Sequence, residues 1–187
     1  VCSSDLFAIY LDEFHVTPGP SADRVRATLA EFVRTRLGPR DQLVVLKPLQ
    51  SILDIALSGD RDAAAAAIES FAPRRGDLAP RTPFERDFIA GQPDRIEAAR
   101  AQIVASSLRA LATDLAQYAP ARKTLIVVSE GLPPGRVRRG GAPAVTADAV
   151  ALAANRSHVS IYTIDPSAGT SPGSNGSRSE EHTSELQ

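Results

Sequence analysis

Residues 123–131 read K-T-L-I-V-V-S-E-G, and their pattern indicates the class of fold. Its central L-I-V-V run is entirely apolar and is followed at once by a polar turn that begins with Ser129 and Glu130. An apolar run without polar alternation is typical of a strand that is buried on both faces, as in a parallel sheet between two layers of helices. The run therefore predicts a buried strand over residues 125–128 in an α/β protein.

Other apolar runs of the chain predict further strands. Residues 7–11 (F-A-I-Y-L), 43–46 (L-V-V-L) and 159–164 (V-S-I-Y-T-I) are strand candidates, and residues 52–57 are a weaker one. In chain order the five predicted strands are 7–11, 43–46, 52–57, 125–128 and 159–164.

Helices are predicted between these strands from apolar positions at helical spacing. The expected helices begin at an N-cap of Ser21, at Asp60 or Ser58, near Pro93 and at Thr146. Residues 72–93 are rich in proline and mixed charges, so we expect them to cross the surface irregularly. Strands that alternate with helices imply a doubly wound, mostly parallel sheet with helices on both faces.

Both ends of the chain have the sequence of translated adapter DNA. Residues 178–187 (R-S-E-E-H-T-S-E-L-Q) read as the translation of a common sequencing adapter, and residues 1–6 (V-C-S-S-D-L) read as the translation of its reverse complement. We therefore expect both ends to be unpacked scars that flank a fragment of a natural protein. The expected domain covers residues 7–170, and residues 171–177 form a flexible tail rich in glycine, serine and proline.

The composition excludes several classes of function. The only cysteine is Cys2, inside the expected scar, so the rest of the chain has no thiol for a disulfide, a zinc cluster or a nucleophile. The formal net charge of −1 is too close to neutral for a nucleic-acid-binding surface. No apolar run approaches the length of about 18 residues that a membrane span needs.

Polar residues follow the predicted strands directly. Asp12 follows the first strand, Ser129 and Glu130 follow the fourth, and Asp165 follows the fifth. Ligands of open α/β sheets bind beyond the carboxyl ends of the strands, so these residues mark the candidate site. The sequence contains no glycine-rich phosphate loop, and Ser129 does not lie in a G-x-S-x-G nucleophile turn.

Three motifs together resemble a von Willebrand factor type A (VWFA) domain. They are the Y-L-D end of the first strand, K-T-L-I-V-V-S-E-G at 123–131, and A-A-N-R-S-H-V-S-I-Y-T-I-D-P at 153–166. The chain is most similar to the bacterial VWFA-related branch, over residues 7–166. The resemblance implies a Rossmann-like sheet of strand order 3-2-1-4-5 with one antiparallel edge strand, and with the last strand of the family missing. It also implies that the parent protein is exported to the periplasm or the cell exterior.

The resemblance also implies where a metal ion would bind. Adhesive members of the family hold a divalent ion with an Asp-x-Ser-x-Ser motif, a threonine and a second aspartate. Asp12 matches the first aspartate and Glu130 stands at the second, but Phe14 and Val16 replace both serines. We therefore expect a degraded metal-ion-dependent adhesion site for Mg²⁺ or another divalent cation, with Asp12 and Glu130 as ligands. Further candidate ligands are Ser129, Thr82 and His15.

The expected function is that of a non-enzymatic, adhesion-type module that binds a protein partner through the loops after strands 1, 3 and 4. One alternative is a metal-free scaffold that binds through Phe14, Val16 and the arginine-rich loop at 136–139. A second alternative is a hydrolase or phosphoryl-transfer enzyme that uses Asp12 as nucleophile or metal ligand. A simpler role for Asp12 is to accept hydrogen bonds from the backbone of its own loop, with Glu13 and His15 solvated.

Overall fold

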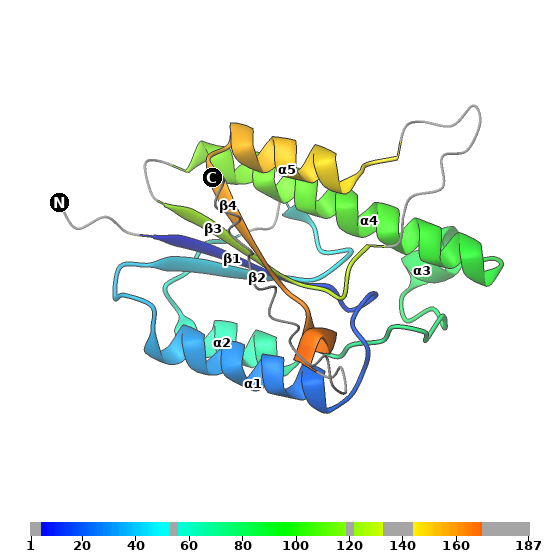
Figure 1. The fold of residues 1–187 in the computed structure, drawn as a ribbon, viewed down its shortest axis with the longest axis horizontal. Coiled ribbons are helices and arrows are strands. Elements are labelled where there is room, and N and C mark those ends of the chain that lie inside the picture. Colours follow the sequence, from blue (N-terminus) through cyan, green and yellow to red (C-terminus); the bar gives the residue numbers. More distant parts are fainter. Residues whose placement is uncertain (1–4, 53–55, 119–121, 133–143, 170–187) are drawn as a thin grey trace, which may run out of the picture.

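The computed structural model describes residues 5–52, 56–118, 122–132 and 144–169. Within them, four parallel strands form one sheet in the order β2-β1-β3-β4 (Figure 1). These strands are β1 (Leu6–Leu11), β2 (Gln42–Leu46), β3 (Lys123–Val128) and β4 (Val159–Ile164). The predictions of an α/β protein and of strands at 7–11, 43–46, 125–128 and 159–164 are therefore confirmed.

Helices cover both faces of the sheet, as expected for a doubly wound fold (Figure 1). The helices α1 (Pro20–Thr35) and α2 (Arg61–Glu69) lie on one face, and α4 (Pro93–Asp114) and α5 (Ala147–Arg156) lie on the other. Because side chains alternate along a strand, Ile9 and Leu11 of β1 lie in the core on the α1 side of the sheet. Ala8 and Tyr10 lie in the core on the α4 side. Burial of these apolar side chains on both faces stabilises the sheet.

The predicted strand over residues 52–57 is not present as a strand in the described part of that segment, and residues 53–55 lie outside it. An isolated antiparallel bridge joins Ser58 to Leu43 at the β2 edge of the sheet. The strands β3 and β4 are the fourth and fifth predicted strands, so in the numbering of the prediction the observed order is 2-1-4-5. The full order 3-2-1-4-5 is therefore not confirmed, because the third strand has no place in the observed sheet.

The helix boundaries follow the capping signals with one exception. Asp60 accepts a hydrogen bond from the amide of Ala63, and Thr146 accepts one from the amide of Ala149, so both predicted N-caps are confirmed. The predicted cap Ser21 is wrong, because α1 already begins at Pro20 with Gly19 as N-cap. Proline fixes a helical φ in the first turn, and the positive φ of Gly19 (144°) suits the entry into it.

The segment 72–93 is irregular except for one short helix that was not predicted. This helix is α3 (Pro83–Phe88), and Thr82 accepts the hydrogen bond of its N-cap from the amide of Glu85. Two further single turns of 3-10 helix are η2 (Leu115–Gln117), directly after α4, and η3 (Pro166–Gly169), after β4. In Figure 1, α3 lies on the side of the molecule toward which the carboxyl ends of the strands point.

The prediction that residues 1–6 are unpacked is wrong for its last two residues. Leu6 begins β1, is buried, and pairs with Gln42 and Lys123 of the neighbouring strands. Asp5 accepts hydrogen bonds from the guanidinium of Arg122. Leu6 is apolar and lies in line with the strand, so it extends β1 by one position even though it belongs to the expected scar. Residues 1–4 and the whole of 171–187 lie outside the described residues.

No helix in the described part of the chain is both long enough and apolar enough to cross a membrane.

Candidate functional site

The carboxyl ends of β1 and β3 bring the candidate residues together. Leu11 pairs with Val128 in the last position of the register, and the amide of Asp12 donates to the carbonyl of Val128 (3.0 Å). The parallel ladder therefore continues one residue beyond β1 and fixes Asp12 beside Ser129. The expectation that Asp12 and Glu130 lie at the same edge of the sheet is confirmed.

The Asp12 carboxylate is buried and accepts hydrogen bonds from inside the protein on both oxygens. Its Oδ1 accepts from the amides of Phe14 (3.2 Å) and His15 (3.3 Å). Its Oδ2 accepts from the Ser129 hydroxyl (2.8 Å) and lies 2.8 Å from His15 Nδ1. A carboxylate has about four lone-pair sites, and these four contacts use them all. Asp12, with 0% of its surface exposed, therefore holds its loop in place.

His15 is buried with Asp12, so the expectation that it is solvated is wrong. Its Nδ1 contacts the carboxylate, while its Nε2 is buried without a hydrogen-bond partner in the described structure. Ser129 and His15 both contact the same oxygen of Asp12 rather than one another. A serine nucleophile needs its hydroxyl on the histidine nitrogen that accepts its proton, and this arrangement does not provide that contact.

The Glu130 carboxylate is also held by internal donors. Its Oε1 accepts from the amide of Thr17 (2.8 Å), and its Oε2 accepts from the Thr17 hydroxyl (2.7 Å) and from Nη1 of Arg75 (2.6 Å). Burial raises the pKa of this carboxyl, but the two Thr17 hydrogen bonds and the Arg75 guanidinium outweigh burial and lower the pKa below its ordinary value. Glu130 is therefore held as a carboxylate beside a cation.

Backbone hydrogen bonds fasten the loop after α2 to the loop after β1. The amide of Arg74 donates to the carbonyl of Glu13 (2.8 Å), and the amide of Arg75 donates to the carbonyl of Val16 (3.0 Å). The amide of Glu130 donates to the carbonyl of His15 (3.2 Å). Segments 13–17, 74–75 and 129–131 thus form one connected surface at the carboxyl edge of the sheet, which we call the rim.

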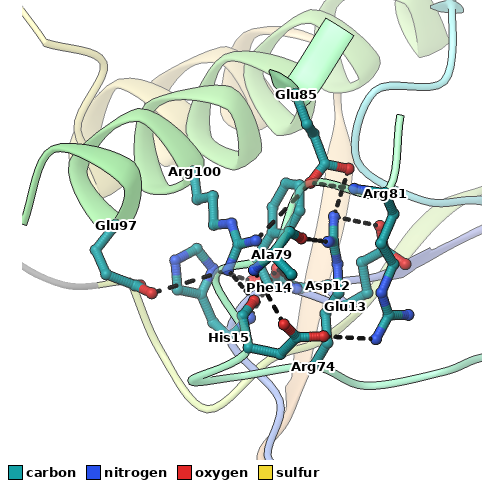
Figure 2. Close-up of polar contacts among 11 residues, drawn as sticks. Asp12, Glu13, Phe14, His15, Arg74, Ala79, Arg81, Glu85, Glu97 and Arg100 are labelled. Atoms are coloured by element: carbon teal, nitrogen blue, oxygen red, sulfur yellow. Dashed lines mark hydrogen bonds and ion pairs between the residues drawn. The ribbon is translucent and has the colours of Figure 1, made fainter. Parts of the chain in front are cut away.

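A buried cluster of two arginines, an aromatic ring and a carboxylate joins the rim to α3 and α4 (Figure 2). The guanidinium carbons of Arg74 and Arg100 lie 4.7 and 4.8 Å from the centroid of the Phe14 ring. Arg74 Nη2 donates to Glu85 Oε1 (2.7 Å), and Arg100 Nη2 lies 3.8 Å from Glu85 Oε2. Arg74 also lies 3.5 Å from Glu13, so the expectation that Glu13 is solvated is wrong. Figure 2 shows these side chains converging from separate segments of the chain.

The remaining candidates take local roles. Thr82 caps α3, and no hydrogen bond joins it to Asp12 or Glu130 in the described structure. Asp165 accepts hydrogen bonds from the amide (2.8 Å) and hydroxyl (2.6 Å) of Ser167. These bonds lower the pKa of the Asp165 carboxyl and hold the turn into η3. The arginines at 136, 138 and 139 lie outside the described residues.

The side chains at the rim do not fit a Mg²⁺ ion in this arrangement. An octahedral Mg²⁺ site needs oxygen ligands that point into a common space. The oxygens of Asp12 and Glu130 instead accept internal hydrogen bonds, and the Arg75 guanidinium contacts Glu130. Among the described residues, no three His, Cys, Asp or Glu side chains gather as metal ligands. Metal binding by Asp12 and Glu130, which the resemblance implies, stays a prediction that experiments in solution can test.

Phe14 and Val16 have no exposed surface. The alternative in which these two side chains contact a partner directly is therefore wrong. Both are part of the hydrophobic interior, Phe14 on the α4 side of the sheet and Val16 on the α1 side. Apolar residues in a loop between two helical layers pack inward because that burial is favourable.

No protein-family model matches the sequence, and no curated protein matches it either.

Sequence reasoning missed the ionic partners of the rim. The charged partners come from the proline-rich segment 72–93 and from α4, which are far from the strand ends in the sequence, and the uncharged partner Thr17 comes from the loop after β1. One local signal was present: Thr82 and Glu85 have the spacing of a capping box, which marks the start of a helix. The missed residues are Thr17, Arg74, Arg75, Glu85 and Arg100.

Proposed function

We propose that this chain is a non-enzymatic protein-interaction domain of the VWFA type. In this proposal the rim is the surface that binds the partner. Internal hydrogen bonds and ion pairs, rather than a bound metal ion, hold it in shape.

The observation that carries the proposal is the state of the two carboxylates at the strand ends. Asp12 is saturated by donors from its own loop and from Ser129, and Glu130 is held by Thr17 and Arg75. In a metal-dependent site both would be directed at the ion. Here the same positions fasten three loops to one another, which favours a surface that is preorganised without a metal.

The fold supports the same family assignment. Four predicted strands have the neighbours that the VWFA resemblance implies, and the bridge at the β2 edge is antiparallel, as is the edge strand of that family. The candidate residues lie at the carboxyl ends of parallel strands, where folds of this type bind ligands.

The burial of Asp12 favours interaction over catalysis. A nucleophile or general base must reach the substrate, and Asp12 has no exposed surface and no free lone-pair site. Ser129 and His15 share an oxygen of Asp12, so neither activates the other. These contacts support an organising role for all three side chains.

Two matched charge reversals test the proposed surface. Arg75 pairs with Glu130 at the rim (2.6 Å), and Arg122 pairs with Asp5 at the opposite end of the strands (2.7 Å), with both arginine side chains exposed. Partners cross-linked to the wild-type chain would be identified by mass spectrometry and compared with those of Arg75→Glu and Arg122→Glu. We expect Arg75→Glu to lose the partner and Arg122→Glu to retain it. Retention of every partner by Arg75→Glu would overturn the proposal, and so would loss of the same partner by Arg122→Glu.

A further inference from the structure

The short helix α3 is attached to the protein in an unusual way. The only buried side chain within it is the charged Glu85, and Ile89 directly after it is the nearest apolar anchor. Its two large apolar side chains, Phe84 and Phe88, are 48% and 74% exposed and stack on one another with centroids 4.9 Å apart. A surface helix normally buries an apolar face and exposes its charges. In α3 the buried side chain is instead a carboxylate, and both phenylalanines are exposed.

Glu85 inserts its carboxylate between two buried cations. It contacts Arg74 and Arg100, whose side chains are each only 1% exposed (Figure 2). The other carboxylates near them, Glu13 and Glu97, lie farther away, at 3.5 Å from Arg74 and 3.9 Å from Arg100. Of the three carboxylates that contact these guanidinium groups, Glu85 is the most deeply buried, with a side chain 3% exposed against 20% for Glu13 and 34% for Glu97.

The two arginines are not fully satisfied by this contact. The Nε atoms of Arg74 and Arg100 are buried and have no hydrogen-bond partner in the described structure. Both guanidinium groups lie over the same Phe14 ring, and burial together with the charge of Arg74 lowers the pKa of the Arg100 guanidinium. Two guanidinium forks over one aromatic ring form a preorganised receptor for a planar carboxylate.

This receptor lies at the edge of the sheet where a ligand is expected. Phe14 belongs to the loop after β1, and Arg74 belongs to the loop that fastens the rim. We propose that Arg74, Arg100 and the Phe14 ring form a carboxylate-binding site that the chain itself occupies with Glu85. An acidic segment of a partner protein then takes the place of Glu85 and displaces α3. The inference rests on the proposed interaction function and names the chemistry of the partner.

Displacement exchanges one carboxylate for another, so the charge of the buried cluster stays the same. The apolar surface that displacement newly exposes comes mainly from Ile89 and the covered half of Phe84, because Phe88 is already 74% exposed. The freed aromatic pair can then contact the partner. These features make Glu85 an internal competitor that weakens partner binding without preventing it.

The substitution Glu85→Gln tests the competition, because it keeps the size of the side chain and removes its charge. Asp87→Asn is the matched control, since Asp87 is an exposed carboxylate of the same helix. The probe is a rhodamine-labelled peptide of six glutamates, measured by fluorescence anisotropy at low salt, with a six-glutamine peptide as the neutral probe. We expect Glu85→Gln to bind the acidic peptide at least tenfold more tightly than the wild type, and Asp87→Asn to bind it like the wild type. Adding Arg100→Gln to Glu85→Gln should abolish the gain.

Equal affinity of the wild type and Glu85→Gln for the acidic peptide would overturn the inference. Hydrogen exchange of the wild type gives an independent test that decides the question if Glu85→Gln does not fold. Saturating six-glutamate peptide should speed exchange of the Glu85 and Ile89 amides, which are bonded to Thr82 and Glu85, at least tenfold and leave β1 unchanged. Unchanged exchange in α3 would overturn the inference.

The proposed function of the rim and the proposed carboxylate site can fail independently of one another. If Glu85→Gln gains peptide affinity but Arg75→Glu retains every natural partner, the carboxylate site stands and the rim is not the partner surface. If Arg75→Glu loses the partner but the peptide experiments give no change, the rim stands and the carboxylate site fails.

Discussion

Asp12 shows how a carboxylate at the carboxyl end of a strand can organise the loop that follows it. Its burial would be costly for an isolated charge, and the contacts of its two oxygens offset that cost. The sequence placed Asp12 correctly at the end of a strand. It did not reveal burial, because burial depends on the segments 74–75 and 129–131, which lie far away along the chain.

We expect Asp12→Ala to destabilise the fold rather than only weaken binding. The substitution leaves the amides of Phe14 and His15 and the hydroxyl of Ser129 without their acceptor. It should lower the free energy of unfolding by about 3 kcal/mol. The matched control is Asp165→Ala, at the exposed end of β4, which should cost less than about 1 kcal/mol. Urea denaturation followed by circular dichroism measures both, and equal losses would contradict the organising role of Asp12.

The lowered pKa values of Glu85 and Glu130 predict a loss of stability in acid. Both pKa values lie below the ordinary 4.5 in the folded state, so their contributions are fully present above the unfolded-state pKa and are lost as the pH falls through the folded-state pKa. The free energy of unfolding should therefore fall below about pH 4.5. Glu130→Gln and Glu85→Gln should each make this decrease shallower. Denaturant titrations between pH 3 and pH 7 that show the same decrease in wild type and both variants would contradict this account.

At the scale of elements, the strands were the most predictable feature. Apolar runs without alternation mark buried parallel strands, and capping residues such as Asp60 and Thr146 mark helix starts. The helix α3 escaped prediction because it has no apolar buried face and is held by an ion pair with Arg74. The same reason hid the cationic cluster, since a contact between residues 14, 74, 85 and 100 leaves no periodic signal in the sequence.

The strand β2 provides a test of which positions form the core. Val44 is buried in the core on the α4 side, and Ser160 of β4 is exposed. Val44→Asp would bury an unpaired carboxylate and should cost more than about 4 kcal/mol, enough to unfold a marginally stable domain. Ser160→Asp should change stability by less than about 1 kcal/mol. A cooperative thermal transition in Val44→Asp similar to that of wild type would show that β2 is placed wrongly.

At the scale of the whole molecule, the parallel sheet gathers the ends of separate strands at one edge. The pairing of β1 with β3 joins residues more than a hundred positions apart, and the loop after α2 closes over them. The sequence predicted this gathering from the alternation of strands and helices. It could not predict that the carboxylates there would accept hydrogen bonds and ion pairs from inside the protein, because those partners come from loops whose paths no sequence pattern fixes.

Isothermal titration calorimetry with Mn²⁺ and Mg²⁺ decides whether the rim is held in shape without a metal ion. We expect neither ion to give saturable binding to the wild-type chain at millimolar concentration, because Asp12 and Glu130 are held by internal donors. The control variant Glu130→Gln should give the same flat titration. Saturable one-to-one binding to the wild type that disappears in Glu130→Gln would contradict the account and would make the rim a metal-dependent adhesion site.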